Sequence, residues 1–367
     1  MGSAALYHLA KRGARICGVE RLGVAHDRGS SHGSLRMIRK AYFEHPDYIP
    51  LVERAYELWR ALEVESGKSL LTECGLLLSG RPDFTLIRGL EECYGQHDLP
   101  HERLTAGEAM RRYPQFRLPE DHAAFWDPVG GYLRVEECVA THLALAQLHG
   151  ADVLAHEDVL SWSSADDLVT VTTDQRTLQA KCLVLTAGAW MGAVFAELRA
   201  PFRVLRKVQL WYDSPNRARY EAGAFPGFYV DTDYGGFYGF PAVDETGMKI
   251  AEHTGGEEVS NPDELDRGLH SQDEAKILKF LGETFLGMQP RRTKFSACMY
   301  SMSADGNFIV DRHARFANVV LAGGFSGHGF KFASVIGEIL TDLALEGRTR
   351  HPVEFLGLSR FANHAAR

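Results

Sequence analysis

The spacing of hydrophobic positions predicts several long helices. Between residues 46 and 66, apolar side chains recur every three or four positions, as they do on the buried face of a helix. A shorter helix is expected at the start of the chain, where the apolar run from Ala4 to Leu9 precedes Gly13, a residue type common just past a helix end. The same spacing recurs in three later segments, residues 136–150, 273–285 and 332–347.

Strand-like segments lie between these helices. Residues 202–213 alternate apolar and polar side chains, which indicates a half-buried strand, and residues 182–187 form the short apolar run of a buried strand. Because no repeat or low-complexity linker separates the segments, we expect interleaved domains and an α/β fold. The other predicted strands are 16–20, 153–162, 168–173, 235–243, 247–253, 307–311 and 318–324.

The first twenty residues have the pattern of the second half of a dinucleotide-binding βαβ unit. Gly2 opens a helix, and the strand that follows ends at Glu20, a position where an acid can accept hydrogen bonds from ribose hydroxyls. Taken alone, Glu20 is better explained as a surface acid at the end of a strand. Because only one glycine of G-x-G-x-x-G is present, we expect that a strand and a glycine turn of about a dozen residues precede Met1 in the natural protein. The alternative is a diverged protein that folds without that strand.

Composition narrows the class of protein. The 367 residues are 45% hydrophobic and 24% charged, with a formal net charge of −8, which is ordinary for a globular protein and argues against a nucleic-acid or anionic-membrane surface. No run is long enough to span a membrane, so we expect a cytoplasmic protein. The histidines form no HExxH motif and the cysteines no CxxC pair, so no metal site is expected. The six cysteines are at positions 17, 74, 93, 138, 182 and 298.

Four segments in order resemble the monomeric sarcosine oxidase family, which includes N-methyltryptophan and pipecolate oxidases. They are RGSSHGSLRMIRKAYFEHPDYIPLVERAYELW, LVLTAGAW, ACMYSMSADGNFIVDRH and VVLAGGFSGHGFKFASVIGEIL, and the resemblance covers essentially the whole chain. It implies a monomeric flavoprotein that oxidises secondary amino acids with O2, releasing H2O2 and an imine that hydrolyses. It also implies a Rossmann-like FAD-binding domain (1–75, 135–200, 296–350), interleaved with a mixed-sheet α+β substrate domain (76–134, 201–295) and followed by a C-terminal tail (351–367).

The resemblance implies that Cys298, in ACMY, bonds FAD covalently. A thiolate is the soft nucleophile that such a bond to the flavin ring requires, and the other five cysteines are interpreted as packing residues. The glycine-rich loop before the helix at Phe332 presents backbone N–H groups that suit a developing anion on the reduced flavin. The remaining expected cofactor-binding residues are Gly2, Glu20, Ser31, His32, Gly188, Trp190, Gly327, Gly329 and Lys331.

Lys249 is the residue that the resemblance assigns to the reaction with O2. It is a single charge inside an apolar strand, where burial without a purpose is costly, and a lysine above the flavin would stabilise nascent superoxide. His253, Arg36 and Tyr300 match further catalytic positions of the family. His253 is explained about equally well as an exposed strand histidine.

A second set of residues is expected to bind the substrate. Arg39 would pair with the substrate carboxylate through its planar guanidinium, and Lys331, in GHGFK, would be the second partner. Tyr238, Tyr229 and Gly327 would line the pocket. Tyr229 occupies a position where sarcosine oxidases carry methionine, so we expect a different pocket wall.

Two alternatives to an oxidase remain open from the sequence. The first is an amino-acid dehydrogenase that passes electrons to a carrier, although Lys249 favours O2. The second is a flavin-free fragment without activity, because the first glycines of the dinucleotide motif are absent. Bound flavin absorbs in the blue, so a visible spectrum would distinguish the second alternative.

Overall fold

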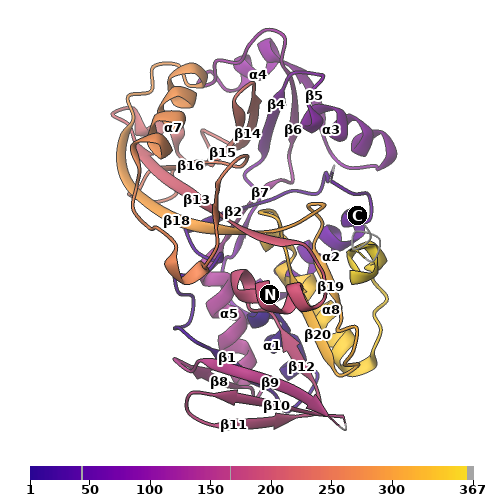
Figure 1. Ribbon diagram of the computed structural model, residues 1–367. Helices are drawn as coiled ribbons and strands as arrows, with labels where there is room; N and C mark the ends of the chain where they lie inside the picture. The colour runs from indigo at the N-terminus through magenta and orange to yellow at the C-terminus, as the bar shows by residue number, and fades with distance from the viewer. Residues whose placement is uncertain (43, 166, 362–367) are drawn as a thin grey trace.

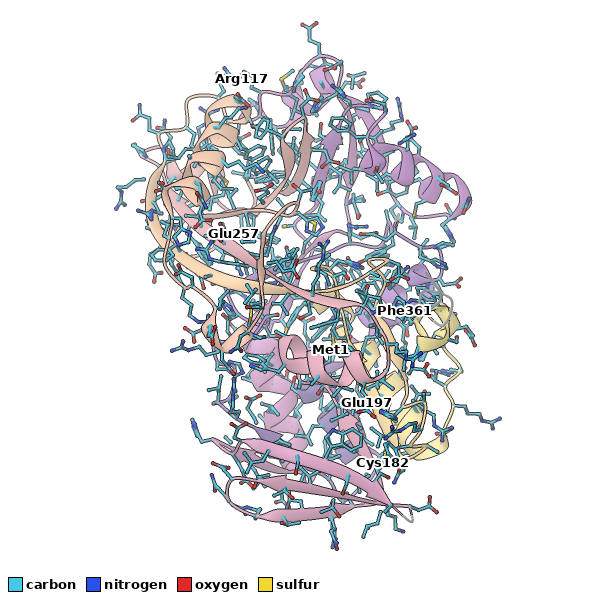
Figure 2. All side chains as sticks on the ribbon, viewed as in Figure 1. Met1, Arg117, Cys182, Glu197, Glu257 and Phe361 are labelled. Carbon is cyan, nitrogen blue, oxygen red and sulfur yellow. The ribbon has the colours of Figure 1, made fainter. Side chains whose placement is uncertain are left out.

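The computed structural model describes residues 1–42, 44–165 and 167–361 (Figure 1). Residues 362–367 of the expected C-terminal tail lie outside the described residues. Most helices and small parallel strand pairs occupy one half of the molecule, and a large mixed sheet occupies the other half. Figure 2 shows Arg117 at the end formed by the large sheet and Cys182 toward the opposite end. The α/β fold class expected from the sequence is confirmed.

Helices in the first half pack on two short parallel strand pairs. Strand β1 pairs with β8, and β12 pairs with β20, which is also antiparallel to β19. Helix α1 packs closely on α8, because a Cβ atom at Gly337 would come within 2.6 Å of Ala4. The elements are α1 (Gly2–Lys11), β1 (Cys17–Glu20), α2 (Tyr48–Ser66), α5 (Val135–Leu148), β8 (Asp152–Ala155), β12 (Leu183–Leu185), β19 (Ile309–Arg312), β20 (Val319–Gly323) and α8 (Ala333–Glu346).

A three-stranded antiparallel sheet forms the outer end of this half (Figure 1). Its order is β11–β10–β9, with bounds β9 (Val159–Ala165), β10 (Leu168–Thr173) and β11 (Thr177–Ala180). The predicted strand 153–162 is therefore two strands, β8 and β9, which belong to different sheets.

The large sheet has the order β17–β13–β16–β15–β14–β4–β6–β5, with β18 also paired to β13. Phenylalanines from its strands and from α7 form an aromatic core. The Phe280 ring of α7 stacks on Phe228 and Phe237, and Phe285, just after α7, contacts Phe228. The elements are β4 (Leu76–Gly80), α3 (Thr85–Gln96), β5 (Glu102–Thr105), α4 (Ala106–Arg112), β6 (Ala123–Asp127), β13 (Phe202–Asp213), β14 (Gly227–Thr232), β15 (Gly235–Phe240), β16 (Met248–Glu252), β17 (Glu257–Val259), α7 (Ser271–Thr284) and β18 (Arg291–Ser303).

A small sheet between the two halves brings the early chain against the large sheet. Its order is β2–β7–β3, from β2 (Leu35–Ile38), β3 (Leu71–Thr72) and β7 (Gly131–Arg134). The short element η4 (Phe330–Phe332) contacts β2, whereas η1 (Gly188–Met191) contacts β18 and β20, and α6 (Gly192–Glu197) contacts β13. Strands β13 and β18 are the longest in the fold and extend from the large sheet toward α6.

The helices predicted from apolar spacing are confirmed as α1, α2, α5, α7 and α8. No helix or strand was predicted within residues 71–134, yet they hold two helices and five strands of two to five residues each. Across the described residues, no helix is both long and apolar enough to cross a membrane.

Candidate active site

The predicted site residues converge from segments that are far apart in the chain. Cys298 comes from β18, Lys249 from β16 and Arg36 from β2, which the small sheet places against the large one. Antiparallel pairing of β13 with β18 and β16 aligns these strands, so that residues in register share a face. Two clusters of cations result.

The first group, here called the thiol cluster, consists of Cys298, Arg36, His32 and Lys249. The Cys298 side chain is buried, and Nη2 of Arg36 lies 3.6 Å from its sulfur. Arg36 also donates to the carbonyl oxygens of Ser30 and Leu35, both at 3.0 Å. Buried His32 contacts the Ser296 hydroxyl at 3.3 Å.

The electrostatics of the thiol cluster favour the thiolate. Burial alone would raise the pKa of the Cys298 thiol, but the hydrogen bond from His32 and the charge of Arg36 outweigh burial and lower this pKa to about 6. A thiolate is the nucleophilic form of cysteine. At neutral pH, Cys298 is therefore the kind of cysteine that forms covalent bonds.

Lys249 is 1% exposed and donates to two backbone carbonyls, those of Gly33 at 2.6 Å and Leu35 at 2.7 Å. Gly33 has φ +90°, and a Cβ there would lie 2.1 Å from the Gln209 side chain, so this position favours glycine. Burial, followed by the charge of Arg36, lowers the pKa of Lys249 well below its ordinary value. An anion in contact with Lys249 would raise that pKa again.

An aromatic wall adjoins the thiol cluster and consists of Tyr229, Tyr238, His253 and Tyr300. Tyr229 and Tyr238 are directly opposite each other on β14 and β15. Nδ1 of His253 lies 3.4 Å from the Tyr300 hydroxyl, and ring centroids of His253 and Tyr229 are 5.9 Å apart. Burial, with the charge of Lys207, lowers the pKa of His253 to about 3, so its imidazole is neutral at physiological pH. His253 is therefore half-buried in the wall and is not an exposed strand residue.

The second group, the carboxylate cluster, consists of Arg39, Lys331, Glu44, Tyr42 and His328. Arg39 donates to a Glu44 carboxylate oxygen at 2.8 Å and lies over the Tyr42 ring, 4.4 Å from its centroid. Lys331 donates to the His328 carbonyl at 2.9 Å, and its Nζ is 5.2 Å from the same ring centroid. The Tyr42 hydroxyl is hydrogen-bonded to Nδ1 of His328. Both predicted cations are thus buried, and neither is on the surface.

The charged groups of the carboxylate cluster shift one another's pKa values. Burial, and then the charge of Arg39, lower the pKa of Lys331 to about 7. Burial would raise the pKa of Glu44, but Arg39, His328 and Lys331 together lower it below its ordinary value. Glu44 is therefore a carboxylate, and it contacts the arginine that the resemblance assigns to a substrate carboxylate.

The glycine-rich loop connects the two clusters. Gly327 has φ +80°, and a Cβ there would come within 2.3 Å of the Tyr300 ring, so the loop backbone lies directly on the aromatic wall. The loop then continues through Gly329 and η4 into α8, which begins at Ala333, one residue after the predicted start. Lys331, at the end of the loop, belongs to the carboxylate cluster.

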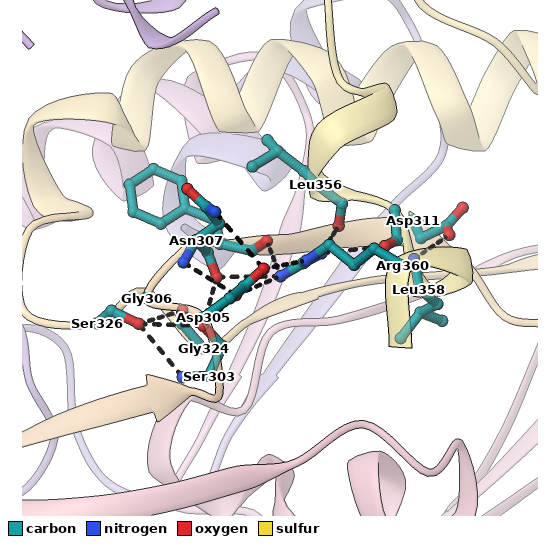
Figure 3. Close-up of polar contacts among 12 residues, drawn as sticks. Ser303, Asp305, Gly306, Asn307, Asp311, Gly324, Ser326, Leu356, Leu358 and Arg360 are labelled. Atoms are coloured by element: carbon teal, nitrogen blue, oxygen red, sulfur yellow. Dashed lines mark hydrogen bonds and ion pairs between the residues drawn. The ribbon is translucent and has the colours of Figure 1, made fainter. Parts of the chain in front are cut away.

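A polar network at the base of this loop holds it in place (Figure 3). The Ser326 hydroxyl donates to the Gly324 carbonyl at 3.1 Å and accepts from the Ser303 N–H at 3.2 Å. On the other side of the turn, Arg360 donates to Asp305 at 2.8 Å and to backbone carbonyls that include Leu356 at 2.6 Å. Arg360, in the described part of the C-terminal segment, thereby holds the turn at Asp305, next to the base of the glycine-rich loop.

A third group of predicted residues lies at the ends of β1 and β12. Glu20 accepts from the Leu22 N–H at 2.9 Å and remains partly exposed. Arg21, the next residue, forms an ion pair with Asp263, and its guanidinium lies 4.8 Å from the Trp190 ring centroid. Trp190 donates to the same carboxylate at 3.0 Å.

The glycines of this third group allow close packing and a left-handed backbone. A Cβ at Gly2 would approach the Thr186 hydroxyl to 2.7 Å, and Gly188 has φ +56°. Ser31 lies apart from this group, in the loop that leads to His32.

The donor set suits a flavin dinucleotide. The Cys298 thiol, with its lowered pKa, is the chemistry that a covalent flavin bond requires. Lys249, Lys331 and Arg39 are buried and could supply positive charge to a reduced, anionic ring system. Glu20, at the end of β1, could accept hydrogen bonds from the ribose hydroxyls of such a group.

Sequence reasoning missed several residues of the site. Glu44 and Tyr42 lay within the quoted RKAYFEH segment but carried no assigned role, and His328 lay between two assigned glycines. Lys207 is buried beside the aromatic wall, yet in sequence it resembles a polar residue on the solvent face of an alternating strand. Glu44 could have been found as the acid nearest to Arg39 in the chain. Lys207 offered no such signal.

Comparisons with known proteins agree over the whole chain. The profile of a family described as FAD dependent oxidoreductase matches residues 1–343. A monomeric sarcosine oxidase of Streptomyces avermitilis is 38% identical over 371 residues, covering 99% of this chain and 95% of the relative. An N-methyl-L-tryptophan oxidase of Yersinia pestis is 32% identical over 363 residues, covering 98% and 96%.

Two solved structures of other proteins resemble this fold over nearly their whole length. NikD, described as an unusual amino acid oxidase essential for nikkomycin biosynthesis, has a TM-score of 0.85 at 25% identity and is matched over 97% of this chain and 94% of its own. An L-proline dehydrogenase from P. horikoshii has a TM-score of 0.85 at 22% identity, over 99% and 95%, which shows a shared fold.

Proposed function

The chain belongs to the family of FAD-dependent oxidoreductases, and from this premise we propose that it oxidises a secondary amino acid, N-methylated or cyclic, with O2 as electron acceptor. That it is a FAD-dependent amine oxidoreductase follows from the family and the relatives. The choice of amine and of acceptor is our proposal. The observation that carries it is the pair of buried cation clusters on either side of one aromatic wall.

We assign FAD to the unit formed by residues 1–75, 135–200 and 296–350, and the substrate wall to residues 76–134 and 201–295. Bound FAD would supply the two-electron acceptor for the amine. Cys298 would hold it covalently, supported by the lowered pKa of the thiol and by Arg36 at 3.6 Å from the sulfur. Glu20 would accept hydrogen bonds from the ribose of its adenosine half.

The carboxylate cluster would orient the substrate. Arg39 and Lys331 are close enough to share the Tyr42 ring, so one carboxylate can contact both cations once Glu44 releases Arg39. Two neighbouring cations also disfavour a protonated amine, which helps the substrate to bind in the neutral form that can be oxidised. The neutral His253 imidazole adds no further charge at the aromatic wall.

Lys249 would serve the reaction with O2. Its Nζ is held by two backbone carbonyls beside Arg36, and although burial lowers its pKa, an anion that forms beside it would favour the ammonium form and be stabilised by it. This placement favours O2 over a protein electron carrier. We further propose that the chain acts as a monomer, as the relatives described as monomeric sarcosine oxidases do.

The test begins with the visible spectrum of the purified protein, followed by acid precipitation. We expect flavin absorption, and we expect the colour to remain with the precipitated polypeptide in the wild type but to pass to the supernatant in Cys298→Ser. Cys93→Ser is the matched control, because Cys93 is also a buried cysteine but lies in α3. Flavin released from the wild type would contradict the covalent assignment.

The second step is a peroxidase-coupled assay for H2O2 with sarcosine, N-methyl-L-tryptophan, L-proline and L-pipecolate, and with glycine as the primary-amine comparison. We expect H2O2 from at least one secondary amine. Turnover seen only with an added dye acceptor would indicate a dehydrogenase and overturn the proposed acceptor.

A further inference from the structure

The edge of the large sheet has a break beside the site. Strand β13 pairs with β16 through Gln209–Tyr212 and with β17 through Val204–Arg206. The intervening segment, residues 253–256, bulges away from the ladder opposite Lys207. Gly255 and Gly256 make the bulge possible, with φ +65° and +118°. Backbone carbonyls in such a bulge lose their strand partners and need other donors.

Lys207 supplies those donors. Its Nζ donates to three consecutive carbonyls, those of His253 at 3.0 Å, Thr254 at 2.7 Å and Gly255 at 3.1 Å. The side chain is 6% exposed, and a Cβ at Gly256 would lie 3.1 Å from the Lys207 Cδ. The ammonium group therefore fills the break in the ladder and uses all three of its N–H bonds on one turn.

The same side chain faces the reacting part of the molecule. Lys207 is directly opposite Cys298 in the β13–β18 register and thus shares its face of the sheet. Its Nζ is 5.1 Å from the Tyr300 ring centroid, and the Tyr300 hydroxyl is 3.4 Å from Nδ1 of His253. Lys207 thus contacts both the backbone carbonyl of His253 and the ring of Tyr300, whose hydroxyl is near the His253 imidazole.

We propose that Lys207 is a positioning residue, which fixes His253 and Tyr300 in the aromatic wall by holding the 253–255 turn with three hydrogen bonds and the tyrosine ring with its charge. This inference rests on the proposed function for its effect on turnover. Its effect on the position of His253 is independent of the substrate.

The charge of Lys207 has a second effect on the same histidine. It is the largest electrostatic contribution, after burial, to the lowered pKa of His253, and burial lowers the pKa of Lys207 itself to about 8. Lys207 thus holds His253 in place and opposes its protonation. A glutamine at this position would keep N–H donors but remove the charge, so the two effects can be separated.

The experiment compares Lys207→Gln and Lys207→Met in the full-length, flavin-loaded protein. The matched control is Lys279→Met, which removes an exposed lysine 3.9 Å from the Tyr234 ring centroid, outside the site. The first readout is the ring Cε1–Hε1 NMR signal of His253 in [13Cε1]histidine-labelled protein, assigned by its loss in His253→Gln.

We expect the His253 signal to shift or broaden in Lys207→Met, to stay near its wild-type position in Lys207→Gln, and to be unchanged in Lys279→Met. With the amine oxidised best by the wild type, kcat/KM should fall about ten- to hundredfold in Lys207→Met, because small displacements of a contacting group have effects of this size. Lys207→Gln should recover most of that loss. In the His253→Gln background, Lys207→Met should cause less further loss than in the wild type, and the remaining loss would come from Tyr300.

An unmoved His253 signal in folded Lys207→Met would overturn the proposal, as would losses that multiply in the double variant. If Lys207→Met fails to fold, Lys207→Gln decides: a wild-type His253 signal supports anchoring by hydrogen bonds, and a displaced signal shows that a neutral donor cannot hold the turn and overturns that mechanism. Absence of turnover with every secondary amine contradicts the proposed function instead, and the NMR comparison still tests Lys207.

Discussion

The thiol cluster and the carboxylate cluster each contain two cations, but they compensate the charge differently. In the thiol cluster, Lys249 and Arg36 donate to backbone carbonyls, and Arg36 also contacts the Cys298 sulfur. In the carboxylate cluster, Arg39 is paired with the Glu44 carboxylate. Dipoles stabilise a buried cation without neutralising it, whereas a carboxylate does neutralise it.

This difference separates two tasks. With Cys298 bonded to FAD, as proposed, no thiolate would offset Arg36 and Lys249, and the thiol cluster would be arranged in advance for a negative charge that develops during the reaction. The carboxylate cluster already contains an acid in contact with its arginine, so an arriving carboxylate must take the place of that acid. One cluster is suited to stabilise a transient anion, and the other is suited to exchange one stable anion for another.

Lys249→Met should have the largest effect and should affect only the reaction with O2. Removing one prearranged charge costs on the order of 10²–10³-fold in the step that it stabilises. We expect the rate of flavin reoxidation by O2 to fall by that factor, with flavin reduction by substrate changed much less. Stopped-flow absorbance measures the two half-reactions separately.

Lys294→Met is the control, because both lysines lie beside the Trp211 ring, with Nζ 5.4 Å (Lys249) and 4.9 Å (Lys294) from its centroid, but Lys294 is exposed. Loss of both half-reactions to the same extent in Lys249→Met would remove the distinction between the clusters.

Arg39→Met should have the next largest effect, on the opposite half-reaction. A hydrogen bond to a charged group is worth about 1.5–3 kcal/mol, so KM for the substrate should rise roughly ten- to hundredfold. Reoxidation by O2 should be nearly unchanged. Steady-state kinetics with varied amine and varied O2 concentrations measure both effects.

Glu44→Gln tests whether Glu44 competes with the substrate for Arg39. If Glu44 must release Arg39 before substrate binds, removing its charge should lower KM by up to about tenfold. An increase in KM would instead mean that Glu44 helps to bind the substrate.

Gly327→Ala tests the connection between the clusters. Its φ of +80° and the 2.3 Å approach of a Cβ to the Tyr300 ring should together cost about 1–3 kcal/mol of unfolding free energy and should displace the aromatic wall. Urea denaturation followed by flavin fluorescence measures this loss. Gly306→Ala is the control, because Gly306 has φ +78° but nothing within 4 Å of a Cβ. Equal losses in the two variants would show that contact with Tyr300 contributes nothing.

The pH dependence of substrate binding should be the smallest effect. Burial lowers the pKa of Lys331 to about 7, so its ammonium form predominates below pH 7 and is lost as the pH rises through 7. A bound carboxylate favours the ammonium form, so affinity should fall a few-fold between pH 6 and pH 8. Titration with pyrrole-2-carboxylate, followed by flavin absorbance, measures this change. Lys331→Met should bind more weakly and with a flatter pH profile, and an unchanged slope would assign the pH dependence to another group.

The sequence by itself determined the elements whose signal is local. The spacing of apolar residues predicted α1, α2, α5, α7 and α8, because the residues on one face of a helix are only three or four positions apart in the sequence. A lone lysine in an apolar strand indicated that Lys249 would be buried, as it is. The short strands of residues 71–134 were not predicted. Two of them, β4 and β7, pair with β14 and β2, which lie far away in the chain, so their place in the sheets depends on distant partners.

Only the tertiary structure decided which charges meet. Arg36 and Cys298 are 262 positions apart, and their contact depends on the small sheet lying against the large one. In sequence, Lys207 is a polar residue in an alternating strand, and only the break between β16 and β17 turns three carbonyls toward it. Hydrophobic periodicity is a local property and can be read along the chain. The environment of a buried charge is set by groups that folding brings from elsewhere, and so it depends on the completed fold.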